Sequence, residues 1–91
     1  MPKRIKSENE IHAGDFCEDC AFHPSLCISV GAEKDDPAGI KGISLVNGHL
    51  RSCSARHCGV RLLTVEEAIR WKLHGPIDEK LESKDRWWKE T

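Results

Sequence analysis

Cysteine and histidine residues crowd into two short segments of this chain. The first segment reads DFCEDCAFHPSLC and spans residues 15–27, and the second reads CSARHC and spans residues 53–58. Thiolate and imidazole groups are the ligands that zinc prefers in proteins, and packing alone seldom gathers so many of them. We therefore expect the two segments to hold a metal ion.

The spacing of the cysteines indicates which of them bind the metal. Cys17 and Cys20 have the CxxC spacing of a zinc knuckle, and Cys53 and Cys58 form a second, wider pair. Four thiolates suit tetrahedral Zn²⁺ at Zn–S distances of about 2.3 Å, and such a closed site is structural because it leaves no position for a substrate. The predicted ligands are Cys17, Cys20, Cys53 and Cys58, with Cys27, His23 and His57 in reserve.

An iron–sulfur cluster is an alternative cofactor. Cys17, Cys20, His23 and Cys27 have the spacing of the bacterial ferredoxin run, with a histidine where the third cysteine would stand. Pro24 follows this histidine rather than the last cysteine, and the second cysteine pair would then have no use. We therefore favour zinc as the cofactor.

The length and composition of the chain favour a metal for a second reason. It has 91 residues, of which 38% are hydrophobic and 5% aromatic. A chain of this size buries a modest share of its surface, and small domains commonly add disulfides, a metal or a partner. The odd number of five cysteines suits a disulfide framework poorly.

The start of the chain, MPKRIKSENE, shows no signal for export. No apolar run approaches the roughly 18 residues that a membrane span requires. We expect a cytoplasmic protein without a membrane partner, whose thiols are kept reduced and available to a metal.

Charges are segregated along the chain although the net charge is only −1. Residues 7–33 contain no lysine or arginine, and residues 37–65 contain no acidic residue. The basic residues of the second stretch are Lys41, Arg51, Arg56 and Arg61. These four could contact the phosphates of a nucleic acid, which is the alternative function. We favour the other interpretation, in which Arg51, Arg56 and Arg61 offset the thiolate charge and attract the acidic first knuckle.

No pattern of residues in the chain predicts catalysis. There is no glycine-rich phosphate loop and no pair of catalytic carboxylates on a recognisable scaffold. His57 and Cys58 are adjacent in sequence, which seldom places an imidazole and a thiol in the geometry of an activated nucleophile. We predict a protein that is not an enzyme.

The elements that would position these ligands are a strand, a hairpin and a helix. Residues 26–31 alternate as a half-buried strand with Leu26, Ile28 and Val30 on one face, and a polar loop follows over residues 32–42. Asn47-Gly48 predicts a two-residue hairpin turn that sets Leu45 opposite Leu50. Residues 59–63 are a candidate for a short strand.

Two helices are predicted at the C-terminal end. Thr64 and Glu67 form a capping box that begins the first, and Gly75-Pro76 ends it. Its apolar stripe consists of Val65, Ala68, Ile69 and Leu73. A second amphipathic helix would run from Ile77 to about Lys89.

Three tryptophans suggest a contact with another protein, because tryptophan is enriched at interfaces. Trp71 lies beside the stripe of the first helix, and Trp87 and Trp88 lie near the end of the chain. The alternative is that the two helices bury these side chains against each other.

The sequence thus predicts a small α+β, zinc-stabilised domain with knuckles, a β-hairpin and one or two C-terminal helices. At the level of architecture this resembles zinc-ribbon and treble-clef proteins. The expected units are a flexible arm over residues 1–10, a metal-binding domain over 11–75 and an amphipathic helix over 76–91. The expected function is a non-catalytic zinc module that acts as a protein-interaction or regulatory adaptor.

Overall fold

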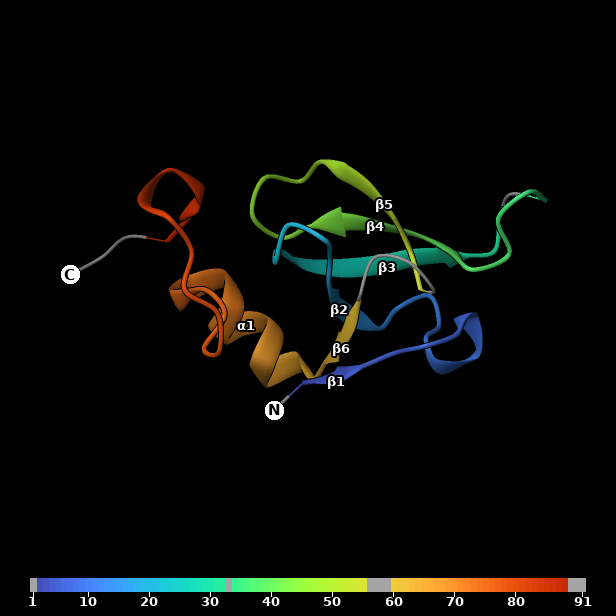
Figure 1. Cartoon of the computed structure of the whole chain (residues 1–91), viewed down its shortest axis with the longest axis horizontal. Coiled ribbons are helices and arrows are strands. Elements are labelled where there is room, and N and C mark those ends of the chain that lie inside the picture. Colours follow the sequence, from blue (N-terminus) through green and yellow to red (C-terminus); the bar gives the residue numbers. More distant parts are fainter. Residues whose placement is uncertain (1, 33, 56–59, 89–91) are drawn as a thin grey trace.

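Six antiparallel strands and one α-helix form an α+β domain in the computed structural model, which describes residues 2–32, 34–55 and 60–88 (Figure 1). The strand order across the sheet is β1-β6-β2-β3-β4-β5. The elements are β1 (Lys3–Arg4), η1 (Glu8–Glu10, a 3-10 helix), β2 (Phe16–Glu18), β3 (Pro24–Val30), β4 (Gly39–Ser44), β5 (Leu50–Ser54), β6 (Arg61–Leu63), α1 (Val65–His74) and η2 (Ser83–Asp85, a 3-10 helix).

The start and end of helix α1 agree with the sequence prediction. The hydroxyl of Thr64 accepts a hydrogen bond from the backbone N–H of Glu67 at 3.1 Å, and the Glu67 carboxylate accepts one from the N–H of Thr64 at 2.9 Å. Gly75 ends the helix at a φ of +79°, a conformation that glycine adopts most readily. These short-range signals fix the helix boundaries.

The face that α1 turns toward the sheet differs from the prediction. Ala68 and Trp71 are the buried residues of the helix, whereas Val65, Ile69 and Leu73 are each more than half exposed. The indole Nε1–H of Trp71 donates a hydrogen bond to Glu18 on β2 at 2.7 Å. This orientation buries a tryptophan and satisfies its polar group. Of the predicted stripe, Ala68 is therefore buried, whereas Val65, Ile69 and Leu73 lie on the outside.

Strand β3 also presents different residues to the core than simple alternation predicts. Cys27 is 1% exposed, whereas Ile28 is 43% exposed. The pairing with β4 shifts between Cys27 and Ser29, where an irregularity inserts an extra residue. This shift allows Cys27 and Val30 to pack on the same core, because an inserted residue changes which side chains face it.

The β4–β5 hairpin is displaced by two residues from the predicted register. Leu50 pairs with Ile43 rather than with Leu45, and residues 45–49 form the connection. The N–H of Leu45 donates to the carbonyl of Pro24 at 2.8 Å, and the Leu45 side chain packs beside α1 and β6. These contacts with distant segments override the two-residue turn that Asn47-Gly48 favours.

Residues near the N-terminus are part of the fold where a flexible arm was expected. Strand β1 pairs with β6, and the N–H of Ile5 donates to the carbonyl of Val60 at 2.9 Å. Ile5 and Ile11 are each only 1% exposed. The N-terminal segment therefore contributes to the core.

The second C-terminal helix is not formed in the described residues 77–88. This segment contains turns, bends and the short η2. Asp78 binds the guanidinium of Arg61 on β6, and the indole N–H of Trp87 donates to the carbonyl of Trp71 at 3.0 Å. These attachments to the sheet and to α1 hold the chain in a non-helical path.

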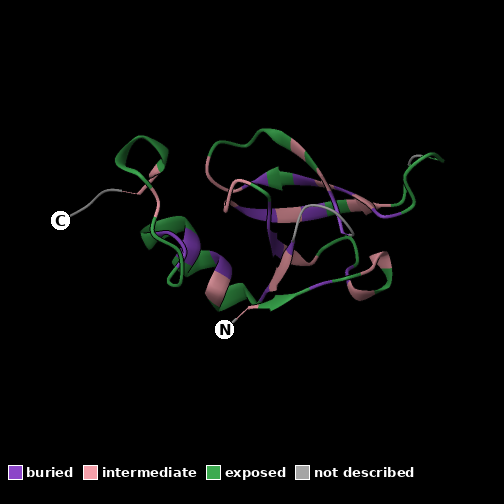
Figure 2. Cartoon of the chain, viewed as in Figure 1, coloured by how far each residue is buried: buried purple, intermediate pink, exposed green. Residues whose placement is uncertain are grey.

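Two apolar clusters lie in the fold, and Figure 2 shows that burial concentrates in the central strands and along part of α1. The smaller cluster joins α1 to the sheet through Leu63, Ala68 and Trp71. The larger one contains Ile5, Ile11, Cys17, Cys27, Ala38, Ile40, Ala55 and Val60. The cysteine-bearing segments thus contribute directly to the larger core.

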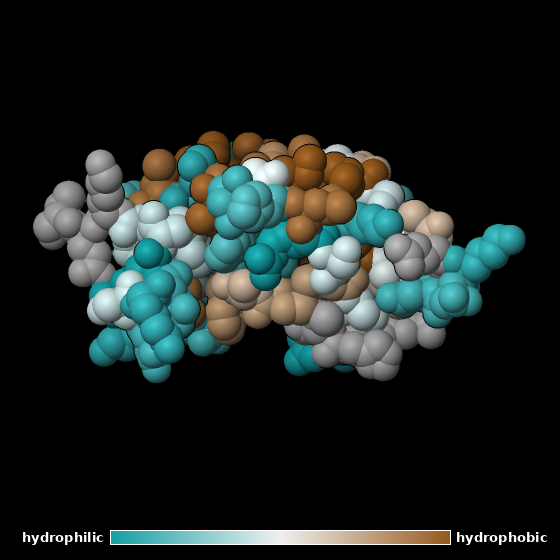
Figure 3. Space-filling model, turned by 90° about the horizontal axis from the view of Figure 1, so that it is seen from above, coloured by the Kyte–Doolittle hydropathy of each residue, from teal (hydrophilic) through white to brown (hydrophobic). Residues whose placement is uncertain are grey.

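Hydrophobic side chains also gather on the surface, along the upper side of the view in Figure 3. The large exposed residues are Ile28, Ile43, Leu50, Val65, Ile69, Leu73 and Ile77. Within the described ranges, no helix has the length and apolar character needed to cross a membrane.

Candidate metal centre

Two thiols from distant parts of the sequence meet at one side of the sheet. Cys20 lies in the turn between β2 and β3, and Cys53 lies on the edge strand β5. Their Sγ atoms are 3.0 Å apart. Cys20 is exposed and Cys53 is half-buried. The structure therefore brings together one cysteine from each of the two predicted pairs.

An ion pair beside the two thiols joins the same two segments. Arg51 Nε lies 3.0 Å from Asp19 Oδ2, and the Asp19 side chain is only 4% exposed. Asp19 immediately precedes Cys20 in the turn. Arg51 and Cys53 are two residues apart on β5, so their side chains lie on the same face of that strand. The Asp19–Arg51 pair therefore positions the turn over β5 and Cys20 against Cys53.

The carboxylate of Asp19 also organises the turn that carries Cys20. It accepts hydrogen bonds from the backbone N–H of Ala21 at 2.9 Å and of His23 at 3.0 Å. The hydroxyl of Ser25 donates to it at 3.1 Å. Phe22 adopts a positive φ of 66° inside this turn. A single buried carboxylate thus holds the β2–β3 turn in shape.

Cys17 lies deeper than the thiol pair. It is 3% exposed and packs in the larger core, and it lines a small pocket of about 10 Å³ together with Cys53 and Val60. Burial raises the pKa of the Cys17 thiol to about 12, and nearby negative groups add to this shift. Cys17 is therefore a neutral thiol near pH 7 unless a cation displaces its proton.

The reserve ligands Cys27 and His23 point to other neighbours. The Cys27 thiol donates to the carbonyl of Ser29 at 3.7 Å inside the core. Nδ1 of His23 lies 3.0 Å from the hydroxyl oxygen of Ser44. The His23 ring also packs edge-on against the Trp87 ring, with 4.8 Å between the ring centroids. Burial lowers the pKa of His23.

This arrangement bears on the iron–sulfur alternative. Cys17 and Cys27 pack in the core, Cys20 lies against Cys53, and His23 lies against Ser44 and Trp87. The four residues of the ferredoxin-like run therefore do not surround a common point in this structure.

Three predicted site residues, Arg56, His57 and Cys58, lie outside the described residues. Within the described part of the chain, no group of three or more histidine, cysteine or acidic side chains is arranged to hold a metal ion. Of the predicted ligands, the described residues that lie together are thus Cys20 and Cys53, with Cys17 beside them.

Arg51 and Arg61, which were expected to offset charge or to bind phosphate, both pair with carboxylates of the acidic segment. Arg61 donates to Glu18 at 2.7 and 2.8 Å and also binds Asp78. The hydrogen bonds to Asp78 and Glu18 raise the pKa of Arg61, and Arg61 in turn lowers the pKa of Asp78. Together with the Arg51–Asp19 pair, these contacts join oppositely charged segments of the sequence.

Of the three tryptophans, Trp71 is covered by the chain itself. It is 1% exposed and belongs to the smaller apolar cluster. Trp87 and Trp88 are half-buried and pack edge-to-face at a centroid distance of 5.1 Å. The two C-terminal tryptophans are therefore the ones with surface available to a partner.

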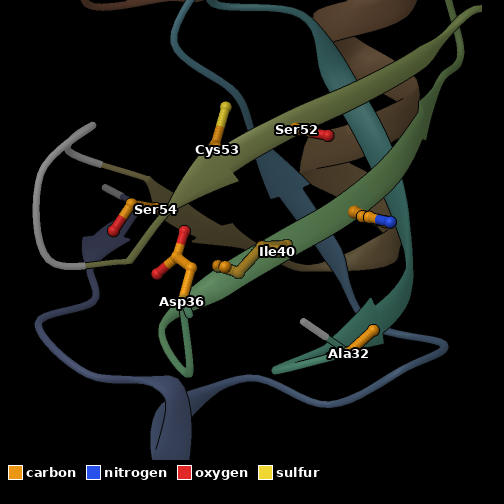
Figure 4. Close-up of a pocket in the computed structure, with 8 residues that line it drawn as sticks. Ala32, Asp36, Ile40, Ser52, Cys53 and Ser54 are labelled. Carbon is orange, nitrogen blue, oxygen red and sulfur yellow. The ribbon is translucent and has the colours of Figure 1, made fainter. Parts of the chain in front are cut away.

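A shallow pocket of about 220 Å³ lies beside Cys53. It is lined by residues of β4, β5 and the loop before β4, namely Ala32, Asp36, Gly39, Ile40, Lys41, Ser52, Cys53 and Ser54. Figure 4 shows Cys53 next to Ser54 and Ile40, with its sulfur directed away from Asp36.

The roles of Glu18 and Asp19 were not foreseen from the sequence. Both are buried, at 3% and 6% exposed, and both bind an arginine of the basic stretch. The opposite charges of the two segments were the available signal. That signal did not reveal which carboxylate would meet which guanidinium, because pairing depends on strand register.

No protein-family model, no curated protein and no solved structure matches this chain.

Proposed function

We propose that the protein is a non-catalytic zinc-binding module that acts as a small protein-interaction or regulatory adaptor. The observation that supports the zinc site is the 3.0 Å contact between the sulfurs of Cys20 and Cys53. In our proposal these two residues bind Zn²⁺ together with Cys17 and Cys58. When bound, the ion would cross-link the β2–β3 turn to β5.

The geometry of the two thiols fits a zinc ion with a small adjustment. Two thiolates at Zn–S distances of about 2.3 Å in a tetrahedral site lie about 3.8 Å apart. Cys20 lies in a turn and not in a strand, so its sulfur can move by the required distance without breaking a strand pair. Cys17 is close enough to Cys53 to line the same small pocket.

The charges around the thiols also suit this function. Two adjacent carboxylates of the acidic segment pair with arginines of the basic stretch: Glu18 at the end of β2 with Arg61, and Asp19 in the following turn with Arg51. These ion pairs position the thiol-bearing segments before a metal binds, which lowers the ordering cost of binding. Four thiolate ligands would leave no open position, so the site would have a structural role.

The exposed apolar residues support the adaptor part of the proposal. Ile69 and Leu73 of α1 are 54% and 56% exposed, and Leu50 at the sheet edge is 61% exposed. Clusters of exposed apolar side chains commonly mark protein-interaction surfaces. The half-buried Trp87 and Trp88 add aromatic surface of the kind found at such contacts.

The nucleic-acid alternative has less support. Arg51 and Arg61 are paired with the buried carboxylates of Asp19 and Glu18, so binding phosphate would compete with these pairs. A titration with duplex and single-stranded nucleic acid at low and at moderate salt tests this alternative. Steeply salt-dependent binding would favour it.

Metal analysis of the chain purified under reducing conditions without oxygen tests the zinc site. We expect a colourless protein with about one zinc per chain, as a closed four-ligand site requires. Cys20→Ser and Cys53→Ser should each lose most of the zinc, whereas Cys27→Ser is the matched control and should keep it. A brown protein that contains iron would contradict the proposal.

A further inference from the structure

The exposed position of the Cys20–Cys53 pair points to a second chemistry at this site. We propose that Cys20 and Cys53 form a reversible intramolecular disulfide when the chain meets a peroxide, and that this oxidation releases the metal. The release of metal depends on the zinc site proposed above. Formation of the disulfide depends only on the placement of the two thiols.

The two sulfurs are already close to bonding distance. They lie 3.0 Å apart, and a disulfide requires about 2.05 Å. The approach of about 1 Å falls on the β2–β3 turn, because Cys20 lies outside the two strands. The rest of the sheet can therefore keep its register when the bond forms.

Burial separates this pair from the two core cysteines. Cys20 is exposed and Cys53 is half-buried, whereas Cys17 and Cys27 are 3% and 1% exposed. A peroxide dissolved in water can reach the first two and is excluded from the other two. Among the four cysteines that the structure describes, oxidation is therefore directed to Cys20 and Cys53, because reactivity follows access to the thiol.

The Asp19–Arg51 ion pair keeps the thiols of Cys20 and Cys53 close together. It joins the residue before Cys20 to the residue two positions before Cys53, at 3.0 Å. With the segments held in this way, the second thiol is in place to attack as soon as the first is oxidised. An intramolecular disulfide should then form faster than a bond between two chains, because the local thiol concentration is high.

The atoms and electrons of the reaction balance with hydrogen peroxide as the oxidant. One thiolate attacks a peroxide oxygen, the O–O bond breaks, and a sulfenic acid and the first water result after protonation. The second thiolate attacks the sulfenic sulfur, which forms the S–S bond and releases the hydroxyl group as a second water. Two thiols are oxidised and one peroxide is reduced, and a disulfide no longer offers thiolate ligands to zinc.

The test uses the full chain, isolated in reduced form and treated with a small excess of hydrogen peroxide. Remaining thiols are alkylated, the chain is digested without reduction, and the peptides are identified by mass spectrometry. We expect one cross-linked pair joining the peptides of Cys20 and Cys53, with the loss of two hydrogens. A zinc-sensitive dye should report release of the bound metal in step with the cross-link, and dithiothreitol should reverse both.

Two cysteine variants test whether the cross-link is specific to this pair. Cys20→Ser should abolish the cross-link, whereas Cys27→Ser should form it as the unaltered chain does. Because the unaltered chain supplies the peptide map, a variant that fails to fold does not affect the outcome. A dominant disulfide to Cys58, a bond between chains, or oxidation to sulfinic acid without a disulfide would overturn the inference.

The two proposals fail separately in this experiment. If the chain holds no zinc but still forms the Cys20–Cys53 disulfide, the zinc site is wrong and the redox-sensitive pair remains. If the chain holds zinc and peroxide gives no such disulfide, even after a chelator has removed the metal, the redox inference is wrong and the zinc site remains.

Discussion

Buried carboxylates are the residues that hold the thiol-bearing turn in place. Asp19 accepts hydrogen bonds from two backbone N–H groups and one hydroxyl, and it pairs with Arg51. A buried charge without such partners would be strongly unfavourable. At the scale of single residues, therefore, the shape of the candidate metal centre depends on Asp19 as much as on the cysteines.

Asp19→Asn removes this charge while it keeps the size of the side chain. We expect the free energy of unfolding to fall by about 2–3 kcal/mol, since the change breaks a largely buried ion pair whose arginine is partly exposed. Zinc affinity should fall by roughly 10-fold because the turn that presents Cys20 loosens. Urea unfolding and a competitive zinc titration measure the two effects.

The control for this change is Asp35→Asn, at an exposed position in the loop between β3 and β4. It removes the same charge and should leave both measurements unchanged. An equal effect of the two substitutions would mean that the net charge of the chain matters and not the Asp19–Arg51 contact.

We expect His23 to make the stability of the fold depend on pH. Burial lowers its pKa from the ordinary value of 6.5, so the folded protein holds a neutral ring where the unfolded chain takes up a proton. The stability that the neutral ring contributes is therefore present above pH 6.5 and is lost as the pH falls toward the lower pKa of the folded state. We expect the urea midpoint to decrease between pH 7.5 and pH 5.

Replacing His23 with Gln should flatten this decrease, and His74→Gln, at an exposed position in the last turn of α1, should not. The urea midpoints of the two variants, measured at a series of pH values, test this expectation. If the His23→Gln chain shows the full decrease, other groups cause the acid sensitivity.

At the scale of elements, the most informative feature is the orientation of helix α1. Its boundaries follow from its capping residues, but its buried face follows from what it meets on the sheet. Trp71 reaches the carboxylate of Glu18, and Ala68 allows close packing at 1% exposure. The helix therefore leaves Val65, Ile69 and Leu73 outside, although these are its most apolar aliphatic residues.

This orientation predicts opposite outcomes for two neighbouring positions. Ile69→Lys should change the free energy of unfolding by less than about 0.5 kcal/mol, because the side chain is 54% exposed. Ala68→Leu should lower it by about 1–3 kcal/mol, because the added atoms overfill a packed contact. Chemical denaturation of both variants measures these changes. A large loss in Ile69→Lys would instead favour the predicted stripe, in which Ile69 faces the core.

At the scale of the whole molecule, the proposed ion joins regions that are far apart in sequence. Cys20 and Cys53 are 33 positions apart, and the segment between them contains β3, β4 and most of β5. Structural zinc sites contribute to folding because the site does not exist in the unfolded chain. Removal of the ion should therefore affect the stability of the entire sheet.

A chelator tests this dependence. We expect it to lower the thermal midpoint of the reduced chain by at least about 10 °C, since a few kcal/mol corresponds to such a shift in a domain of this size. Added zinc should restore the midpoint. The Cys53→Ser chain is the control, and its midpoint should not respond to either reagent. Equal midpoints of the stripped and untreated chains would show that zinc does not stabilise the fold.

The parts of the fold that could be predicted are those with local causes. The capping box and Gly75 fix α1, and runs of β-forming residues mark most of the long strands. The grouping of Cys20 with Cys53 came from a different signal, the metal-ligand spacing of the two cysteine pairs, and the structure places their sulfurs 3.0 Å apart. Capping and β-propensity act over a few residues, so they can be recognised in the sequence alone.

The tertiary structure alone decided the features that depend on contacts between distant segments. These include the irregularity after Cys27, the hairpin register at Leu50, the buried face of α1 and the non-helical path of residues 77–88. In each case a local preference competes with a hydrogen bond or an apolar contact from elsewhere in the chain. The distant contact prevails because it buries surface or satisfies a buried polar group, which the sequence pattern by itself does not reveal.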